Sequence, residues 1–376
     1  MDRLAPRPPL PGEPAPWFTL RADCNPAFHF DTIAGRYIVL SFFESASLAG
    51  SGEALEEFLA ATARFNGIEA AFVGVTVDPA DERLVPRFAT LPATRLLFDP
   101  DRAVSGLYGA VTLSGEQPAY ARLTYVLDPR LRVLARFPFD GAPGTHARRV
   151  LDYLDRLPRL GSPTPANVDA HAPVLIVPRV FEPELCRDLV AFYEREGGRP
   201  SGFMRDVEGR TRLVHDADHK VRSDQPVTDQ RLRDAMLARI RSRLVPEIAR
   251  AFQFHATRIE RHIVACYGGG TQGHFRAHRD NTTRGTAHRR FAVTLNLNAG
   301  EYEGGELCFP EYGWRTYLAP TGAAIVFSCS LLHEALPVTR GRRYAYLPFL
   351  YDDAAAGLRA ANQQYLDLPP PDAEGA

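Results

Sequence analysis

The sequence predicts a two-domain protein of mixed class: an α/β sandwich in the N-terminal half, and a mainly β domain, a double-sheet barrel or jelly roll with outer helices, in the C-terminal half. Strand and helix signals alternate up to about residue 157, which is typical of a central sheet covered by helices. From residue 258 onward, strand signals separated by glycine and proline turns dominate. Residues 159–172 are rich in proline and small residues without periodicity, as in a linker. We therefore place the domains at residues 1–158 and 173–353, and we expect the tail, residues 354–376, to be flexible.

The N-terminal elements follow from short apolar runs. Tyr37–Phe43 is almost continuously apolar, which indicates a strand buried on both faces. Further strands are expected at residues 70–77, 96–98, 123–127 and 133–137, and helices at residues 53–65, 80–88 and 145–157.

The C-terminal domain is expected to open with two helices, Glu182–Glu196 and a longer one from Asp229 to Phe252. Pro246 lies inside the second helix and should end or kink it, because proline lacks the amide hydrogen. Phe291–Asn298 alternates apolar and polar residues, the period of a half-buried strand.

Length and composition exclude several classes of protein. A chain of 376 residues suggests two or three domains at about 150 residues each. Because 44 Lys and Arg balance 45 Asp and Glu, the chain has no overall basic field, and we expect no nucleic-acid partner. Residues 1–12 lack the apolar core of a signal peptide, and the apolar runs are shorter than the ~18 residues of a membrane span. The five scattered cysteines indicate a reducing compartment, so we expect a cytoplasmic protein without a membrane partner.

The segment Gly273–Asn281 predicts a metal site. In an extended strand, residues two apart project from the same face, so His278 and Asp280 can reach one ion. His333 offers a third ligand beside an apolar strand. Two histidines and one carboxylate on one face of an octahedral ion leave three open positions, as in non-haem Fe(II) oxygenases. Those positions suit a bidentate 2-oxo acid and O2, and the planar guanidinium of Arg343 could bind the distal carboxylate of that acid.

Four segments in this order and spacing closely resemble the prolyl 4-hydroxylase-like 2-oxoglutarate/Fe(II) dioxygenases: Ile263–Gly270, His278–Asn281, Glu303–Leu307 and His333–Tyr344. The resemblance implies a double-stranded β-helix with flanking helices. It also implies oxidation of a substrate C–H bond, coupled to decarboxylation of 2-oxoglutarate to succinate, with ascorbate often keeping the iron reduced.

The resemblance also assigns roles to individual residues. It implies that His278, Asp280 and His333 are the iron ligands and catalytic residues, and that Arg343 binds the 2-oxoglutarate carboxylate. It further suggests that Tyr267 and Asn296 line the co-substrate pocket, although family members often carry an aromatic residue where this chain has Asn296.

Several other histidines and arginines allow only less specific predictions. His274 and His278 are four residues apart, as in helical zinc sites, but no Glu follows His274 and the glycines before it disfavour a helix; His274 is expected in a loop or against the substrate. Arg340 and Arg342 are expected to be solvated. Residues 205–227, which include His215, His219 and Arg222, fit a substrate lid and a solvated loop equally well.

The N-terminal block resembles the peroxiredoxin (AhpC/TSA-type) branch of the thioredoxin fold, through Pro11–Leu20, the Phe42-Phe43 strand and Arg122–Pro129. In that family a cysteine begins the helix after the Phe-Phe strand; Ser51 stands in that place here. A serine hydroxyl is not ionised near neutral pH and cannot replace a peroxidatic thiolate. We therefore expect a redoxin scaffold without peroxidase chemistry, serving in docking or dimerisation, with Arg122 a relic of the lost site.

Three hypotheses for the function follow. The first is a dioxygenase that hydroxylates an unactivated C–H bond, with peptidyl proline or a related side chain as the candidate target and a peptide, protein or small molecule as the substrate. The second is a thiol peroxidase that uses Cys24, the one cysteine of the N-terminal block. The third is an iron- or O2-responsive binding protein whose redoxin domain docks a partner.

Overall fold

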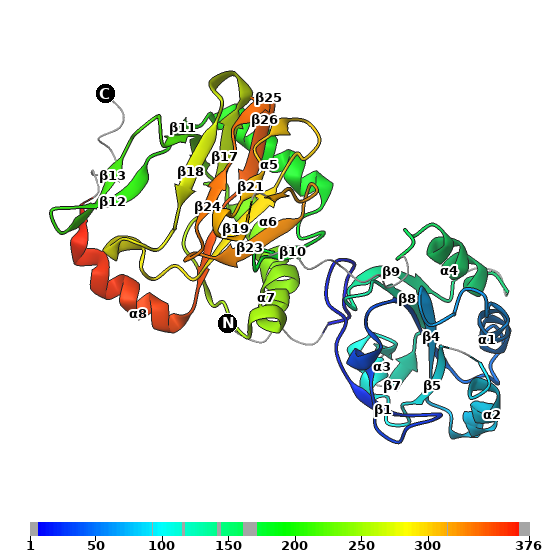
Figure 1. The fold of residues 1–376 in the computed structure, drawn as a ribbon. Helices are drawn as coiled ribbons and strands as arrows, with labels where there is room; N and C mark the ends of the chain where they lie inside the picture. The colour runs from blue at the N-terminus through cyan, green and yellow to red at the C-terminus, as the bar shows by residue number, and fades with distance from the viewer. Residues whose placement is uncertain are drawn as a thin grey trace. The chain divides into compact units, whose positions relative to one another are not determined.

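The computed structural model describes residues 7–91, 93–114, 117–140, 144–160, 171–313 and 315–367. Their contacts divide the chain into two compact units, residues 1–166 and 167–376 (Figure 1). The division falls inside the predicted linker, most of which (residues 161–170) lies outside the described residues. None of the helices in the described ranges combines the length and the hydropathy needed to cross a membrane.

The first unit is built on a seven-stranded mixed sheet in the order β2-β1-β5-β4-β3-β8-β9. Its three central strands run parallel, and β8 and β9 join antiparallel, which confirms the predicted thioredoxin-like α/β sandwich. The strands are β1 (Thr19–Ala22), β2 (Phe28–His29), β3 (Tyr37–Glu44), β4 (Ala70–Thr76), β5 (Thr94–Phe98), β8 (Leu123–Leu127) and β9 (Val133–Pro138). The sequence analysis did not foresee β1, β2 or a short hairpin of β6 (Val111–Ser114) and β7 (Gln117–Tyr120).

Both faces of this sheet are buried, as the apolar run of β3 predicts. Ile38, Leu40 and Phe42 face a core that includes α3 (Ala103–Leu107). Val39 and Phe43 face the opposite core, beneath α1 (Ser51–Ala60), α2 (Val85–Phe88) and α4 (His146–Asp155). The expected helix over residues 80–88 is a 3-10 turn, Pro79–Leu84, followed by the single turn of α2.

The second unit contains two main sheets. The larger has the strand order β10-β23-β19-β26-β17-β15-β11, with β16 and β27 attached to it, and the smaller has the order β14-β18-β24-β21-β22. The larger sheet consists of β10 (Leu175–Val177), β23 (Ala324–Ser328), β19 (Phe291–Asn296), β26 (Arg342–Tyr346), β17 (Ile263–Gly268), β15 (Ser223–Pro226), β11 (Arg199–Pro200), β16 (Arg258–Ile259) and β27 (Phe349–Tyr351). The smaller consists of β14 (Lys220–Val221), β18 (His274–His278), β24 (His333–Ala335), β21 (Leu307–Cys308) and β22 (Thr316–Tyr317). This two-sheet architecture agrees with the predicted jelly roll.

The outer face of the larger sheet is covered by α5 (Pro183–Glu196), α6 (Gln230–Arg239) and α7 (Val245–Phe252) (Figure 1). Helices α6 and α7 are joined by a π-helical turn, Ile240–Leu244, immediately before Pro246. The turn widens the helix where proline cannot donate a hydrogen bond, so the predicted interruption takes the form of a π-bulge.

Strand β19 differs from the prediction of a half-buried strand. Val293 and Leu295 pack against the helices, but Thr294 and Asn296 on the other face are also buried, at 5% and 1% exposure. That face looks into the space between the two sheets, where polar side chains find partners in place of solvent. Asn296, for example, donates its amide hydrogen to the Ala319 carbonyl at 2.6 Å.

The expectation of a flexible tail is wrong for residues 354–367. Helix α8 (Asp353–Asn362) begins where the Asp352 side chain accepts a hydrogen bond from the Ala355 amide at 2.8 Å. Strand β28 (Leu366–Asp367) then pairs in parallel with β13 (Arg210–Val214). The alanine-rich composition that suggested disorder instead supports a helix with a side-chain N-cap. Residues 368–376 lie outside the described residues.

Candidate metal centre and substrate cleft

The two histidines that the sequence separates by 55 positions lie directly opposite each other. His278 ends β18, His333 begins β24, and the two residues are partners in the antiparallel ladder between these strands. Asp280 follows β18, and its backbone amide donates to the Cys329 carbonyl at 2.9 Å. The smaller sheet therefore brings all three predicted ligands to one end of a strand pair.

The donor atoms of these residues converge. The His278 Nε2 atom lies 3.6 Å from Asp280 Oδ1, and the His333 Nε2 atom lies 3.4 Å from Asp280 Oδ2. One ligand atom from each residue fits within a set whose members are all within 4.8 Å of one another. Neighbouring ligands of an octahedral ion with bonds of about 2.1 Å are about 3 Å apart, so small adjustments would bring this set onto one metal.

Backbone carbonyls orient both imidazole rings. His278 Nδ1 lies 2.7 Å from the Arg276 carbonyl, and His333 Nδ1 lies 3.0 Å from the Leu331 carbonyl. A carbonyl can only accept, so each Nδ1 carries the proton and each Nε2 presents a lone pair toward the other ligands. The rings are therefore held in the tautomer that binds a metal.

Burial favours the ligand form of these groups. His333 is 5% exposed, and burial lowers its pKa to about 4, which keeps the imidazole neutral. For Asp280, burial raises the pKa of the carboxyl, but the neighbouring His333, His278 and Arg289 oppose it and the pKa falls below its ordinary value. A neutral imidazole beside an ionised carboxylate is the donor set that a divalent metal requires.

A charged pair that the sequence analysis did not foresee supports Asp280 from behind. Arg289 donates to the Asp280 carbonyl at 3.3 Å and forms a two-pronged ion pair with Glu260, at 2.6 and 2.7 Å. His288 also contacts Glu260 at 3.0 Å. Glu260 lies in the loop after β16, and His288 and Arg289 lie in the loop before β19, so no local sequence pattern links the carboxylate to its partners.

Arg343 lies beside this centre, in a cavity between the sheets. The cavity is lined by Tyr267, Phe275, Leu307, Phe327 and the three metal-binding side chains, among others. Arg343 is 2% exposed, and its Nε atom is buried without a hydrogen-bond partner. Buried donors of this kind are rare unless a ligand satisfies them. A carboxylate in the cavity would do so.

Tyr267 and Asn296 both approach Arg343, but differently. Tyr267 pairs with Arg343 across strands β17 and β26, and its ring centre lies 5.1 Å from the guanidinium carbon. Tyr267 also lines the cavity. Asn296 is not among the lining residues; its Oδ1 lies 3.5 Å from Arg343 Nη2, so Asn296 contacts Arg343 rather than the cavity.

The Glu303–Leu307 motif makes room for Arg343. A Cβ atom at Gly305 would lie 2.9 Å from Arg343 Cδ and 2.8 Å from Val338 Cγ2, and the backbone φ of Gly305 is +73°. Any other residue here would both strain the backbone and displace Arg343. Glycine at position 305 is therefore explained by steric requirements alone, without reference to the family resemblance.

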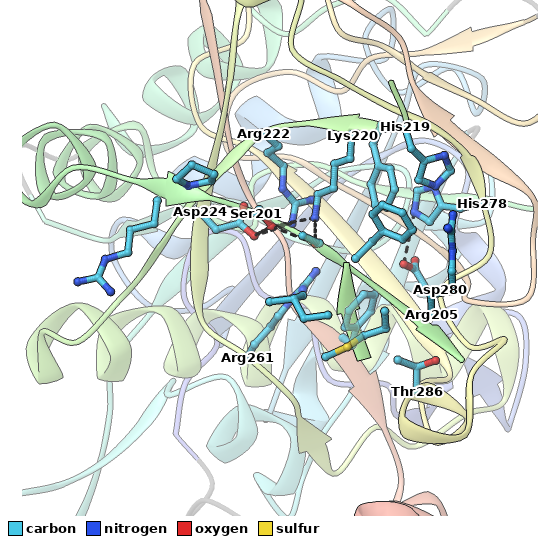
Figure 2. Close-up of a pocket in the computed structure, with 18 of the residues that line it drawn as sticks. Ser201, Arg205, His219, Lys220, Arg222, Asp224, Arg261, His278, Asp280 and Thr286 are labelled. Atoms are coloured by element: carbon cyan, nitrogen blue, oxygen red, sulfur yellow. Dashed lines mark hydrogen bonds and ion pairs between the residues drawn. The ribbon is translucent and has the colours of Figure 1, made fainter. Parts of the chain in front are cut away.

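A larger cleft of about 990 Å3 opens outside the metal-binding residues (Figure 2). Its walls include β14, β15 and the hairpin of β12 (Phe203–Val207) and β13. Within residues 205–227, Arg205, His219 and Arg222 line this cleft, whereas His215 is exposed outside it. The segment that sequence alone left undecided therefore forms short strands and contributes part of the wall of the cleft.

Three further residues considered in the sequence analysis, His274, Arg340 and Arg342, do not line the cleft. His274 is not among its lining residues; the ring contacts the Gln272 carbonyl at 2.9 Å. Arg340 pairs with Glu303 and Arg342 with Glu194, both on the exposed surface, as expected of solvated positions.

In the first unit, Ser51 and Arg122 occupy the positions that correspond to the active site of the peroxiredoxin family. Ser51 begins α1, is fully buried, and donates its hydroxyl hydrogen to the Phe43 carbonyl at 2.7 Å. Arg122 Nη1 donates to Ser51 Oγ at 2.9 Å and to the Ala49 carbonyl at 2.8 Å. Arg122 thus contacts Ser51, the residue that stands where the family has its cysteine, and Cys24 is exposed.

Known families match both units. Residues 262–351 match the model of the 2OG-Fe(II) oxygenase superfamily, and residues 11–136 match that of the AhpC/TSA family, which confirms both predicted resemblances. The PKHD-type hydroxylase PiuC of Pseudomonas aeruginosa is 36% identical over 88 residues, 21% of this chain and 38% of that protein. The chain thus spans less than half the length of the curated relatives it matches.

Solved structures align with each unit. A prolyl-4-hydroxylase of Pseudomonas putida aligns with 48% of this chain and 92% of its own, at 20% identity and a TM-score of 0.36. The bacterioferritin comigratory protein of Xanthomonas campestris aligns with 37% of this chain and 90% of its own, at 22% identity and a TM-score of 0.33. The superfamily match in the C-terminal unit implies Fe(II), 2-oxoglutarate and O2 as its reagents.

Proposed function

We propose that the C-terminal unit, which carries a 2OG-Fe(II) oxygenase domain, is a dioxygenase that hydroxylates an unactivated C–H bond of a separate substrate. The observation that carries this proposal is the convergence of His278, Asp280 and His333 next to a cavity that holds the buried guanidinium of Arg343. Bound in this site, Fe(II) and 2-oxoglutarate would supply the electrons that activate O2, which is the oxidant of the substrate C–H bond.

The side chains of this chain would hold and orient those reagents. His278, Asp280 and His333 would bind the metal through one face, and the second ring nitrogen of each histidine is already occupied by a backbone carbonyl. Arg343 would bind the distal carboxylate of 2-oxoglutarate through two parallel hydrogen bonds, with Tyr267 beside it. Apolar side chains such as Phe275 and Phe327 would exclude water from the cavity, which strengthens these electrostatic contacts.

For the substrate, we include a prolyl residue of a peptide, or a related side chain, as the candidate target. The curated relative PiuC is named a PKHD-type hydroxylase, and the cleft of about 990 Å3 is large enough to admit a peptide segment. Ascorbate is included as the reductant that restores Fe(II) between turnovers.

The test is succinate formation from 2-oxoglutarate by the full chain under Fe(II), O2 and ascorbate, compared with Asp280→Ala. Removal of the one carboxylate ligand should abolish both metal binding and succinate formation. Asp188→Ala, which removes an exposed carboxylate of α5, is the matched control and should keep the wild-type rate. Equal turnover in the wild type and Asp280→Ala would contradict the proposal.

Two other functions give different results in the same assay. Tight iron binding without succinate formation, even without an added substrate, would favour an iron- or O2-responsive binding protein whose N-terminal unit docks a partner. Peroxide consumption that disappears in Cys24→Ser would favour a thiol peroxidase.

A further inference from the structure

The cleft outside the metal-binding residues carries a cluster of cationic side chains. Lys220, Arg222, Arg261 and Arg289 all line it, and Lys220, Arg222 and Arg289 are only 7%, 7% and 9% exposed. In Figure 2, Lys220, Arg222 and Arg261 approach the same part of the cleft, and His278 and Asp280 lie at its other end. The cluster thus faces the space from which a substrate would reach the metal.

Two of the four cations have carboxylate partners. Arg222 pairs with Asp224 at 2.6 Å, and Arg289 pairs with Glu260 at 2.6 Å. The pKa of Asp224 reflects this environment: burial raises it, but Arg222 and Lys220 lower it more strongly, to about 2. Both carboxylates are therefore already committed to an arginine.

Lys220 and Arg261 have no such partner among the residues that the structure describes. Lys220 Nζ donates to Ser201 Oγ at 2.8 Å and to the Gly202 carbonyl at 2.5 Å. Arg261 donates through Nε to the Leu347 carbonyl at 3.1 Å and stacks 4.4 Å from the Phe349 ring centre. Among the described residues no hydrogen-bond partner is found for the two outer nitrogens of Arg261, and Arg261 lines both the cleft and the inner cavity.

This arrangement is unfavourable without an anion. Burial and the neighbouring Arg222 lower the pKa of Lys220, and burial together with Arg289 and Arg222 lowers the pKa of Arg261 to about 10. An oxyanion placed between Lys220 and Arg261 would remove this repulsion and satisfy the free Arg261 donors. Arg343 occupies the inner cavity and is the cation proposed for 2-oxoglutarate, so a second anion site points to a second molecule.

We propose that Lys220 and Arg261 bind an anionic oxygen group, a carboxylate or a phosphate, of the primary substrate, and that this contact fixes which C–H bond faces the metal. The proposal rests on the dioxygenase function proposed above and narrows its substrates to acidic molecules or acidic peptide segments. Arg222 and Asp224 would act as the supporting pair that holds the wall of the site in place.

Binding to a redox-inert complex tests this proposal. The full chain is loaded with Zn(II) and saturated with N-oxalylglycine, an unreactive analogue of 2-oxoglutarate, so that the inner cavity is filled. The N-methylamides of N-acetylglutamate and N-acetylphosphoserine, in which the α-carboxyl is capped, and, as the neutral amide, the N-methylamide of N-acetylglutamine are then titrated by calorimetry. At least one acid should bind ten times more tightly than the amide, and comparison of the two acids distinguishes a carboxylate from a phosphate.

Variants assign that binding to the cluster. Arg261→Gln should weaken the binding of the preferred acid by about 10- to 100-fold, the range expected for hydrogen bonds between charged groups. Arg340→Gln, which removes an exposed arginine outside the cleft, should leave the affinity within about twofold, as for other surface charges. If thermal unfolding shows that Arg261→Gln is not folded, Lys220→Gln replaces it with the same expected loss.

Three results would overturn the inference: acids that bind no better than the amide, an equal loss in Arg340→Gln, or an equal loss of N-oxalylglycine affinity in Arg261→Gln. The last would place Arg261 in the co-substrate site, since Arg261 also lines the inner cavity. Because the assay needs no turnover, a negative result leaves the succinate test of the dioxygenase function unaffected, and failure of that test leaves the binding result readable.

Discussion

Replacement of Arg343 by methionine should separate the stability of the second unit from its ability to bind a co-substrate. Arg343 is 2% exposed, and among the described residues no carboxylate forms an ion pair with it. Its Nε atom is also buried without a partner. Methionine keeps an unbranched apolar stem and removes an uncompensated buried charge. The free energy of unfolding of the ligand-free protein should therefore be unchanged or raised, on the order of 1 kcal/mol.

Co-substrate binding should change in the opposite direction. Loss of one partner of a buried ion pair costs about 3–5 kcal/mol, which corresponds to a roughly 10²- to 10⁴-fold weaker affinity for N-oxalylglycine. The wild type at a hundredfold excess over Kd should gain about 2.7 kcal/mol, or about 5–10 °C in Tm for a unit of this size. The Arg343→Met variant should show almost none of this gain.

Thermal unfolding and calorimetry with Zn(II) and N-oxalylglycine measure both effects in one preparation. Arg340→Met is the matched control, because Arg340 lies on a neighbouring strand but is exposed and paired with Glu303. An Arg343→Met variant that binds the analogue within threefold of the wild type, or that loses several kcal/mol of stability without ligand, would refute the assignment of Arg343 as a ligand-binding cation.

Three further predictions concern stability and the redoxin-like site. Ser51→Cys in a Cys24→Ser background should give a thiol with a pKa below the ordinary value of about 8.5, because Arg122 and the N-terminus of α1 favour the thiolate. The rate of thiol alkylation as a function of pH measures this pKa. Adding Arg122→Met should raise it. Burial lowers the pKa of His146 to about 4, so the stability that depends on its neutral form is fully present above pH 6.5. About 3 kcal/mol of the free energy of unfolding should be lost between pH 6.5 and 4. Denaturant titrations should show that loss in the wild type and a smaller one in His146→Gln. Leu295→Ala should lower the free energy of unfolding of the second unit by about 2–5 kcal/mol because Leu295 is fully buried, whereas the exposed Leu318→Ala should change it by less than about 0.5 kcal/mol in the same titrations.

The sequence by itself determined the local parts of this protein. The apolar run of β3 predicted a strand buried on both faces, and the spacing of His278 and Asp280 placed both side chains on one face of an extended segment. Pro246 predicted an interruption in the long helix, and the structure has a π-bulge there. Such features depend on the intrinsic geometry of a few consecutive residues, so they can be read before the fold is known.

Only the tertiary structure decided what lies between distant segments. Strand register, which is set by packing of whole sheets, places His333 opposite His278. Both faces of β19 are buried, so Asn296 contacts Arg343, although the alternating pattern of the strand had suggested that its polar side chains face solvent. The cationic cluster around Arg261 could not be foreseen either. Lys220 and Arg222 lie at β14, whereas Arg261 and Arg289 lie in loops elsewhere in the chain, and each one, taken alone, resembles an ordinary surface charge. Long-range pairing fixes these positions, and no local pattern records it.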